Sequence, residues 1–314
     1  MLTSQAIEGF VLDLLSGNYA TRTVEGYKTN LRHLCDFLGD PEIGTVALDD
    51  LKRFMAYLKT DYQPVRMNHS TAPLSGSAQD NHWKAIRTFY RWAEEALQVR
   101  NITEKLPRPK YSTPEIIPFS EDEIKTMLSV LDSSRLFKRQ NTKEYRLRRP
   151  TALRDRAIFL MLLDTGMRIG ELCRLEIRDV NLATGEVNIA PFSTGKKTTP
   201  RTVYMGKAAR RTVWLYVAKL KEYDPKDRLF NVNPTPVRQI LKSLEKRSGV
   251  RDIHPHRFRH TFAIEFLRNG GDVFTLKRLL GHRSLDMVQH YLAIARSDVE
   301  NAHRTASPVD RWRL

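Results

Sequence analysis

The sequence predicts a mainly helical α+β protein of two domains. Apolar residues recur at helical spacing along much of the 314-residue chain, and two β-type runs stand at 185–190 and 201–205. The stretch 106–114 has the polarity and proline content of an interdomain linker. We therefore expect a helical N-terminal domain at 1–107, a linker at 108–114, and a mixed domain with a small antiparallel sheet at 115–314.

Amphipathic spacing predicts four helices in the N-terminal domain, at 6–15, 21–37, 48–58 and 78–97. Thr21 is expected to cap the second helix, and a loop rich in Pro, Ser and Thr lies at 61–77. Basic residues on the exposed helix faces could contact phosphates, although a merely solvated role is equally compatible with each of them. They are Lys28, Arg32, Lys84, Arg87 and Arg91.

In the second domain, Ser120 and Glu123 form a capping-box pattern that predicts the start of a helix. Further along, the run 162–172 indicates the end of an apolar helix, a glycine turn, and a second helix that begins at Arg168. An arginine there would add its charge to the free amides and positive dipole end of the helix. This position therefore favours an anion.

The two β-type runs lie on either side of a polar, glycine-containing turn, which predicts a hairpin. Lys196 would sit near its tip and could reach into a site. Its neighbour Lys197 is a rival for the same role.

Cations, imidazoles and a late tyrosine gather between residues 255 and 291. Pro255 suits a first helical turn, and phenylalanines at 258, 262 and 266 predict a helix with an apolar core face. His256 and Arg259 would then share a face of that helix. Because guanidinium forks match the charge that grows on phosphate oxygens in transesterification, we expect chemistry on a phosphodiester.

The charge of the chain agrees with a polyanionic partner. The formal net charge is +16 and the pI is about 9.9. Residues 1–110 hold 14 of the 52 Lys and Arg residues and 13 of the 36 Asp and Glu residues. The excess positive charge therefore lies with the proposed chemistry.

Cys35 and Cys173 lie far apart among apolar helix residues, which is typical of reduced core positions in an intracellular protein. Neither an 18-residue apolar span nor a signal-peptide pattern is present. We expect a cytoplasmic protein with no membrane partner.

The motifs resemble those of the tyrosine recombinases, the phage-integrase and Xer group. The matching elements are Arg168 in Thr-Gly-Met-Arg-Ile-Gly-Glu-Leu, Lys196 in a Gly-Lys hairpin, His256-x-x-Arg259, Gly281-His282, and Tyr291 nine residues after His282. Residues from about 115 to 300 resemble the catalytic domain, and residues 1 to about 108 the helical core-binding domain.

The resemblance implies a site-specific recombinase that cleaves and rejoins double-stranded DNA. Tyr291 would attack the phosphorus and form a 3′-phosphotyrosyl link. Arg168, Arg259 and His282 would hold the non-bridging oxygens. Lys196 would protonate the leaving 5′-oxygen, and His256 would assist proton removal from the tyrosine.

Further positions follow from the same resemblance. Glu171 would orient its neighbours, and Lys197 and Arg201 are expected to contact DNA. Neither a metal nor another cofactor is needed, because the phosphotyrosyl ester conserves the energy of the broken bond. A homotetramer on two recombination sites would pass through a Holliday junction, and accessory factors or a partner recombinase could take part.

Three alternatives stay open. One is a type IB topoisomerase, which shares the chemistry. Another is a metal-dependent hydrolase, with His254, His256 and His260 as metal ligands, since histidines four apart can share a Zn²⁺. The third is a DNA-binding protein that has lost catalysis.

Two segments have less certain roles. The basic segment 133–150 is either a DNA-contacting loop or a disordered insert. Residues 297–303 could begin a short helix, which in relatives often docks on a neighbouring protomer.

Overall fold

The computed structural model describes residues 1–65, 71–112, 115–132, 149–191, 200–282, 284–285, 288–289, 291–292, 307 and 309. The chain divides after residue 114 into two compact units, which are described separately below. The fold class is confirmed, because helices dominate the structure and its sheet has two antiparallel strands. Within these residues, no helix has both the length and the apolar character required to cross a membrane.

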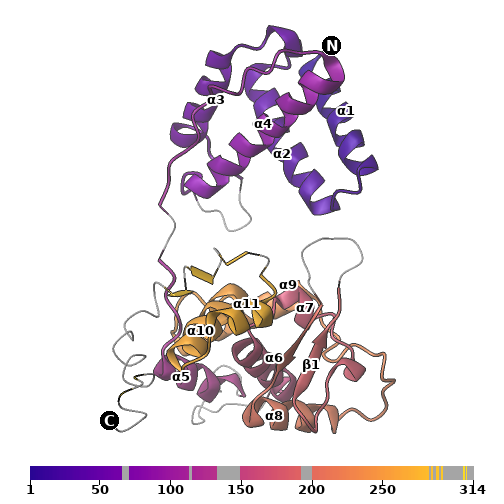
Figure 1. Cartoon of the computed structure of the whole chain (residues 1–314), viewed down its shortest axis with the longest axis vertical. Coiled ribbons are helices and arrows are strands. Elements are labelled where there is room, and N and C mark those ends of the chain that lie inside the picture. Colours follow the sequence, from indigo (N-terminus) through magenta and orange to yellow (C-terminus); the bar gives the residue numbers. More distant parts are fainter. Residues whose placement is uncertain are drawn as a thin grey trace, which may run out of the picture. The chain divides into compact units, whose positions relative to one another are not determined.

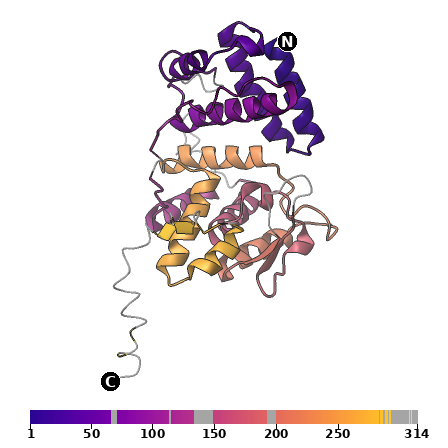
Figure 2. The same ribbon diagram turned by 45° about the horizontal axis from the view of Figure 1, so that its top comes forward.

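The N-terminal unit contains the four expected helices, α1 (Thr3–Ser16), α2 (Thr21–Leu38), α3 (Leu48–Thr60) and α4 (Gly76–Leu97), with a short 3₁₀ turn at Ile43–Thr45. Figures 1 and 2 both show α1 and α2 side by side. Fully buried Phe10, Leu31, Phe54 and Phe89 come from all four helices and form one core. Cys35 is buried at its margin, as expected.

The expected cap at Thr21 is wrong. Ala20 is the N-cap residue of α2, and no side chain caps the first turn, while Thr21 is already helical. The helix gains its stability from packing instead, since Val24, Leu31 and Leu34 bury its apolar face.

The first part of the sequence-predicted linker packs on α4. Leu106 is buried, and its carbonyl accepts a hydrogen bond from the indole of Trp83. Arg108 forms a bidentate ion pair with Asp80, which is fully buried, at 2.7 and 3.1 Å. Buried charge must be paired, so this contact fixes the chain as far as Arg108.

The C-terminal unit is mainly helical. Its helices are α5 (Glu121–Leu131), α6 (Ala152–Thr165), α7 (Ile169–Leu172), α8 (Lys207–Val217), α9 (Pro234–Ser248), α10 (Pro255–Arg268) and α11 (Val273–Leu280). A second 3₁₀ turn lies at Ile177–Asp179. The predicted hairpin is present as β1 (Glu186–Ile189) and β2 (Arg201–Tyr204), paired antiparallel with Val187 opposite Val203.

Sequence signals explain the ends of the key elements. The capping box of α5 is confirmed, with reciprocal hydrogen bonds between Ser120 and Glu123, and Pro255 opens α10. Helix α6 runs through the core and contacts both α8 and α10. Phe258 of α10 is fully buried against Phe119 and Phe159, so the predicted core face of this helix is confirmed. Cys173 is also buried.

Several sequence predictions fall outside the described residues. These are the proposed hairpin-tip lysines Lys196 and Lys197, most of the basic segment 133–150, and the expected helix at 297–303.

Candidate functional site

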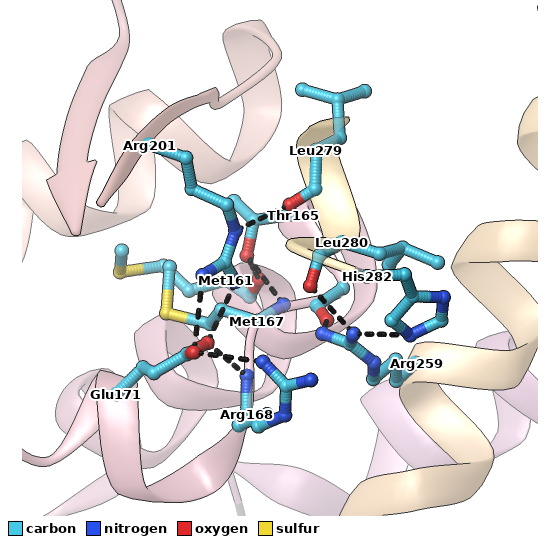
Figure 3. A network of polar contacts seen from close by, with 11 residues as sticks. Met161, Thr165, Met167, Arg168, Glu171, Arg201, Arg259, Leu279, Leu280 and His282 are labelled. Atoms are coloured by element: carbon cyan, nitrogen blue, oxygen red, sulfur yellow. Dashed lines mark hydrogen bonds and ion pairs between the residues drawn. The ribbon is translucent and has the colours of Figure 1, made fainter. Parts of the chain in front are cut away.

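Arg259 is the most deeply buried cation of the site. Its side chain leaves α10 and donates hydrogen bonds to the carbonyl oxygens of Gly166 at 2.8 Å and Leu280 at 2.6 Å. Gly166 ends α6 and Gly281 ends α11, both with left-handed backbone (φ +58° and +66°) that suits glycine. The ends of two helices thus converge on one guanidinium, as Figure 3 shows.

Glu171 joins two further arginines to this site. Its carboxylate accepts two hydrogen bonds from Arg201 of β2, at 3.1 and 2.7 Å, and one from the side chain of Arg168 at 3.1 Å. Burial raises the pKa of Glu171, but hydrogen bonds from Arg201 outweigh this effect and the pKa lies below its usual value. The carboxylate therefore stays ionised and holds both arginines (Figure 3).

The helix that follows Arg168, α7, is short. Helix α7 has only four residues, and Glu171 already accepts the backbone N–H of Arg168 at 2.8 Å. The acidic side chain therefore satisfies one backbone amide at this helix start, which leaves fewer free amides for an anion. The side chain of Arg168 is 33% exposed, so its guanidinium is accessible to an anion.

Arg201 lies buried within this network. Its side chain is 6% exposed, and its Nε atom donates to the carbonyl oxygen of Leu279 at 2.6 Å. Arg201 therefore joins β2 and α7 to the end of α11. DNA contact by Arg201 stays a prediction. Its burial was not predicted, because an arginine after a hairpin tip carries no signal of burial.

His282 follows the end of α11 and lies against Arg259. The Nη2 atom of Arg259 donates to Nε2 of His282 at 2.8 Å, which places the imidazole proton on Nδ1. This Nδ1 atom is buried without a hydrogen-bond partner among the described residues. Burial, then the charges of Arg259 and Arg168, lowers the pKa of His282 to about 4, so the ring is neutral at pH 7.

Tyr291 lies at the same site. It is 4% exposed, and its ring lies 6.5 Å, centroid to centroid, from that of His282. Burial raises the pKa of Tyr291, although the charges of Arg259 and Arg168 oppose this. The hydroxyl is therefore protonated at neutral pH.

The partner of that hydroxyl is His260, which the predicted site did not include. Its Nδ1 atom is 2.8 Å from the Tyr291 oxygen. Burial, together with the positive surroundings of α10, lowers the pKa of His260 to about 4. The sequence signal was the position of His260 one helical turn after His256, which places both on one face.

His256 itself is exposed, and its ring centroid is 6.4 Å from that of His260. It shares a side of α10 with Arg259, as predicted, but lies nearer to solvent. His254, by contrast, is the N-cap residue of α10, and its Nδ1 accepts the backbone N–H of Arg257 at 3.3 Å.

These contacts leave an excess of positive charge. Three arginines, Arg168, Arg201 and Arg259, surround a single carboxylate, that of Glu171, while the half-buried His260 and His282 are neutral. Burial and the charge of Arg168 lower the pKa of Arg259 to about 9, which is the mark of a buried cation without an acidic partner. A net charge of about +2 in a buried site favours an anion.

The histidines of α10 do not form a metal centre in the residues that the structure describes. No group of three or more His, Cys, Asp or Glu side chains there is placed to hold an ion. His254 is occupied in capping, and the surrounding arginines would repel a cation.

The predicted phosphate-contacting residues of the N-terminal unit have mixed surroundings. Lys28, Arg32 and Arg91 are exposed on α2 and α4. Arg87 lies over the ring of Trp83 at 4.9 Å, and Lys84 pairs with Asp80 at 2.7 Å. The first three are therefore the freer cations of the five.

Comparison with known proteins gives the family. Residues 118–297 match the phage integrase family, and residues 7–99 match the phage integrase N-terminal SAM-like domain. The chain therefore belongs to the phage integrase family, and the tyrosine recombinase resemblance is confirmed.

Individual relatives match over most of the chain. It is similar to tyrosine recombinase XerC of Staphylococcus haemolyticus (26% identity, covering 93% of this chain and 92% of the relative). It is also similar to tyrosine recombinase XerA of Saccharolobus solfataricus (26% identity, covering 95% and 91%). These relatives favour neither the topoisomerase nor the metal-hydrolase alternative.

Solved structures share the fold. The Tn1549 transposon integrase in complex with transposon right end DNA superposes with a TM-score of 0.70 at 19% identity, with 100% of both chains covered. A lambda integrase dimer bound to a core site gives a TM-score of 0.66 at 16% identity, covering 91% of this chain and 97% of the other.

Proposed function

We propose that this protein is a site-specific DNA recombinase in which Tyr291 attacks a DNA phosphate held by Arg168 and Arg259. The observation that carries the proposal is the buried excess of positive charge beside a buried tyrosine hydroxyl. Transesterification places extra negative charge on the non-bridging phosphate oxygens, and preorganised cations stabilise it.

Each donor has a part in this reaction. Arg259 is fixed by two carbonyl oxygens and Arg168 by Glu171, so neither must reorganise when the phosphate arrives. The Nδ1–H of His282, without an acceptor among the described residues, would donate to a phosphate oxygen. His256, on the exposed side of α10, would meet the phosphate from the solvent side.

The resemblance supplies the remaining steps. Lys196 would protonate the leaving 5′-oxygen, and the product would be a 3′-phosphotyrosyl ester that needs no cofactor to be resealed. Exposed Lys28, Arg32 and Arg91 support phosphate contacts by the N-terminal unit. Two domains so linked would close around the duplex, and four copies would pair two sites in the cytoplasm through a Holliday junction.

The test is covalent adduct formation. The protein is incubated with DNA of its source organism, denatured in SDS, and the adducts are mapped to give the cleavage site. Wild-type protein should form adducts, whereas Tyr291→Phe, which removes one oxygen and little surface, should form none while it still binds the mapped site. Adducts of the Phe variant would refute Tyr291 as the nucleophile.

A further inference from the structure

The hydroxyl of Tyr291 has one hydrogen-bond partner among the described residues, Nδ1 of His260 at 2.8 Å. Tyr291 is 4% exposed, and a buried hydroxyl needs an acceptor for its proton because an unpaired buried donor costs about 1–3 kcal/mol. An imidazole nitrogen without a proton is such an acceptor. The contact is therefore best described as donation from Tyr291 to His260.

The surroundings keep His260 in the neutral form that this contact requires. His254, His256 and Arg259 lie on the same helix, and His282 faces it from the end of α11. Burial, then His256, His254 and Arg259, disfavours an imidazolium at His260, and no carboxylate among the described residues pairs with it. His260 is thus an acceptor at neutral pH.

From this geometry we propose that His260 is the general base that takes the proton of Tyr291 during attack on the DNA phosphate. This rests on the proposed function. The family resemblance assigns this task to His256, which is exposed, lies one helical turn earlier, and has no such contact among the described residues. His260 therefore touches the reacting oxygen, whereas His256 lies exposed to solvent.

The step balances in atoms and charge. A bond forms between Tyr291 Oη and phosphorus as the bond from phosphorus to the 5′-oxygen breaks. The tyrosine proton moves to Nδ1 of His260, and the 5′-oxygen takes a proton from the general acid, proposed as Lys196. In the resealing step the attacking 5′-hydroxyl gives its proton back to the general acid, the bond from phosphorus to Tyr291 Oη breaks, and His260 returns its proton to the tyrosine oxygen. The enzyme therefore ends unchanged.

The same geometry disfavours proton transfer from Tyr291 to His260 in the protein without DNA. The low basicity of His260 and the protonated state of Tyr291 both oppose proton transfer in the free protein. A bound phosphodiester adds a negative charge beside the imidazole, which stabilises the imidazolium. Proton transfer would therefore be coupled to the presence of the substrate.

The test compares variants at His260 on the mapped DNA site, in single-turnover cleavage between pH 6 and 9. A substrate with sulfur in place of the bridging 5′-oxygen makes the leaving group independent of a general acid. His260→Asn keeps a polar atom near the position of Nδ1 but cannot accept a proton, whereas His260→Ala removes the contact. His256→Ala, one turn away, is compared for the shape of its pH profile only, because His256 is itself placed at the phosphate.

If His260 is the base, both His260 variants lose about 10²-fold or more at pH 7, the usual scale of general-base catalysis. Their rates should also rise close to tenfold per pH unit, because attack then needs a tyrosine that has already lost its proton. Wild type and His256→Ala should show a nearly flat profile. If His260→Asn cleaves at the wild-type rate, His260 is only a positioning residue and the proposal is overturned. The proposal is also overturned if His256→Ala, and not the His260 variants, shows the steep rise in rate with pH.

A measurement without DNA separates this proposal from the proposed function. Nitrogen-15 NMR of histidine-labelled protein, with His260→Asn for assignment, reports which ring nitrogen carries the proton. Nδ1 without a proton at pH 7 is expected, and a protonated Nδ1 would refute the acceptor role. Wild-type protein that forms no adduct would refute the recombinase function, while the NMR result would still decide where the proton lies.

Discussion

Replacing Arg201 by methionine tests whether this residue holds the site together or contacts DNA. The side chain is 6% exposed and supplies two of the three side-chain hydrogen bonds on the Glu171 carboxylate. Removing one partner of a buried ion pair typically costs about 3–5 kcal/mol, because the other charge is left without compensation. Arg168 still pairs with Glu171, so we expect a loss near the lower value, about 3 kcal/mol.

The assay is urea unfolding followed by circular dichroism, with the transition of the C-terminal unit fitted separately. Lys207→Met is the matched control, since Lys207 is exposed at the start of α8 and should cost at most about 0.5 kcal/mol. The double variant Arg201→Met with Glu171→Gln removes both charges and should recover about 1.5 kcal/mol or more.

Arg201→Met should also slow cleavage, because Glu171 and with it Arg168 would shift. If it leaves stability unchanged and only weakens binding of the DNA site, Arg201 is a DNA contact and the interpretation of the network is wrong.

Other variants test separate parts of the account. Arg259→Ala should lower cleavage about 10²–10³-fold, the scale of losing a preorganised anion donor, with site binding retained; a near wild-type rate in single-turnover cleavage would make this arginine dispensable. Lys196→Ala should be rescued by the sulfur-containing substrate and Lys197→Ala should not, so equal impairment on both substrates would move the general acid elsewhere. The pKa of Asp80 is held well below its usual range by its hydrogen bond from Arg108, so its stabilising effect is present above about pH 4 and lost as pH falls towards its folded-state pKa. Asp80→Asn should therefore destabilise the N-terminal unit at pH 7 but progressively less in thermal melts at lower pH, and a deficit that stays constant with pH would contradict this pairing.

Most of the fold could be predicted from the sequence because its signals are local. Helical periodicity gave the helices of the N-terminal unit, and the pattern of Ser120 and Glu123 gave the start of α5. The cap at Thr21 failed because burial on one face stabilises α2 without it. The pairing of Arg108 with Asp80 could not be predicted, because it joins residues 28 positions apart.

The site residues also divide into those that sequence motifs predict and those that depend on tertiary contacts. Arg168, Arg259, His282 and Tyr291 were predicted from motifs, and the structure brings them to one place. The buried position of Arg201 and the contact of His260 could not be predicted, since both depend on which elements meet at the end of α11.

The central claim is that Tyr291 becomes covalently joined to DNA. The most direct measurement is mass spectrometry of wild-type adducts after nuclease and protease digestion. The account predicts a nucleotide on the peptide that contains Tyr291, attached through its hydroxyl oxygen to a 3′-phosphate. A nucleotide on any other residue, or a 5′-phosphate linkage, would contradict it.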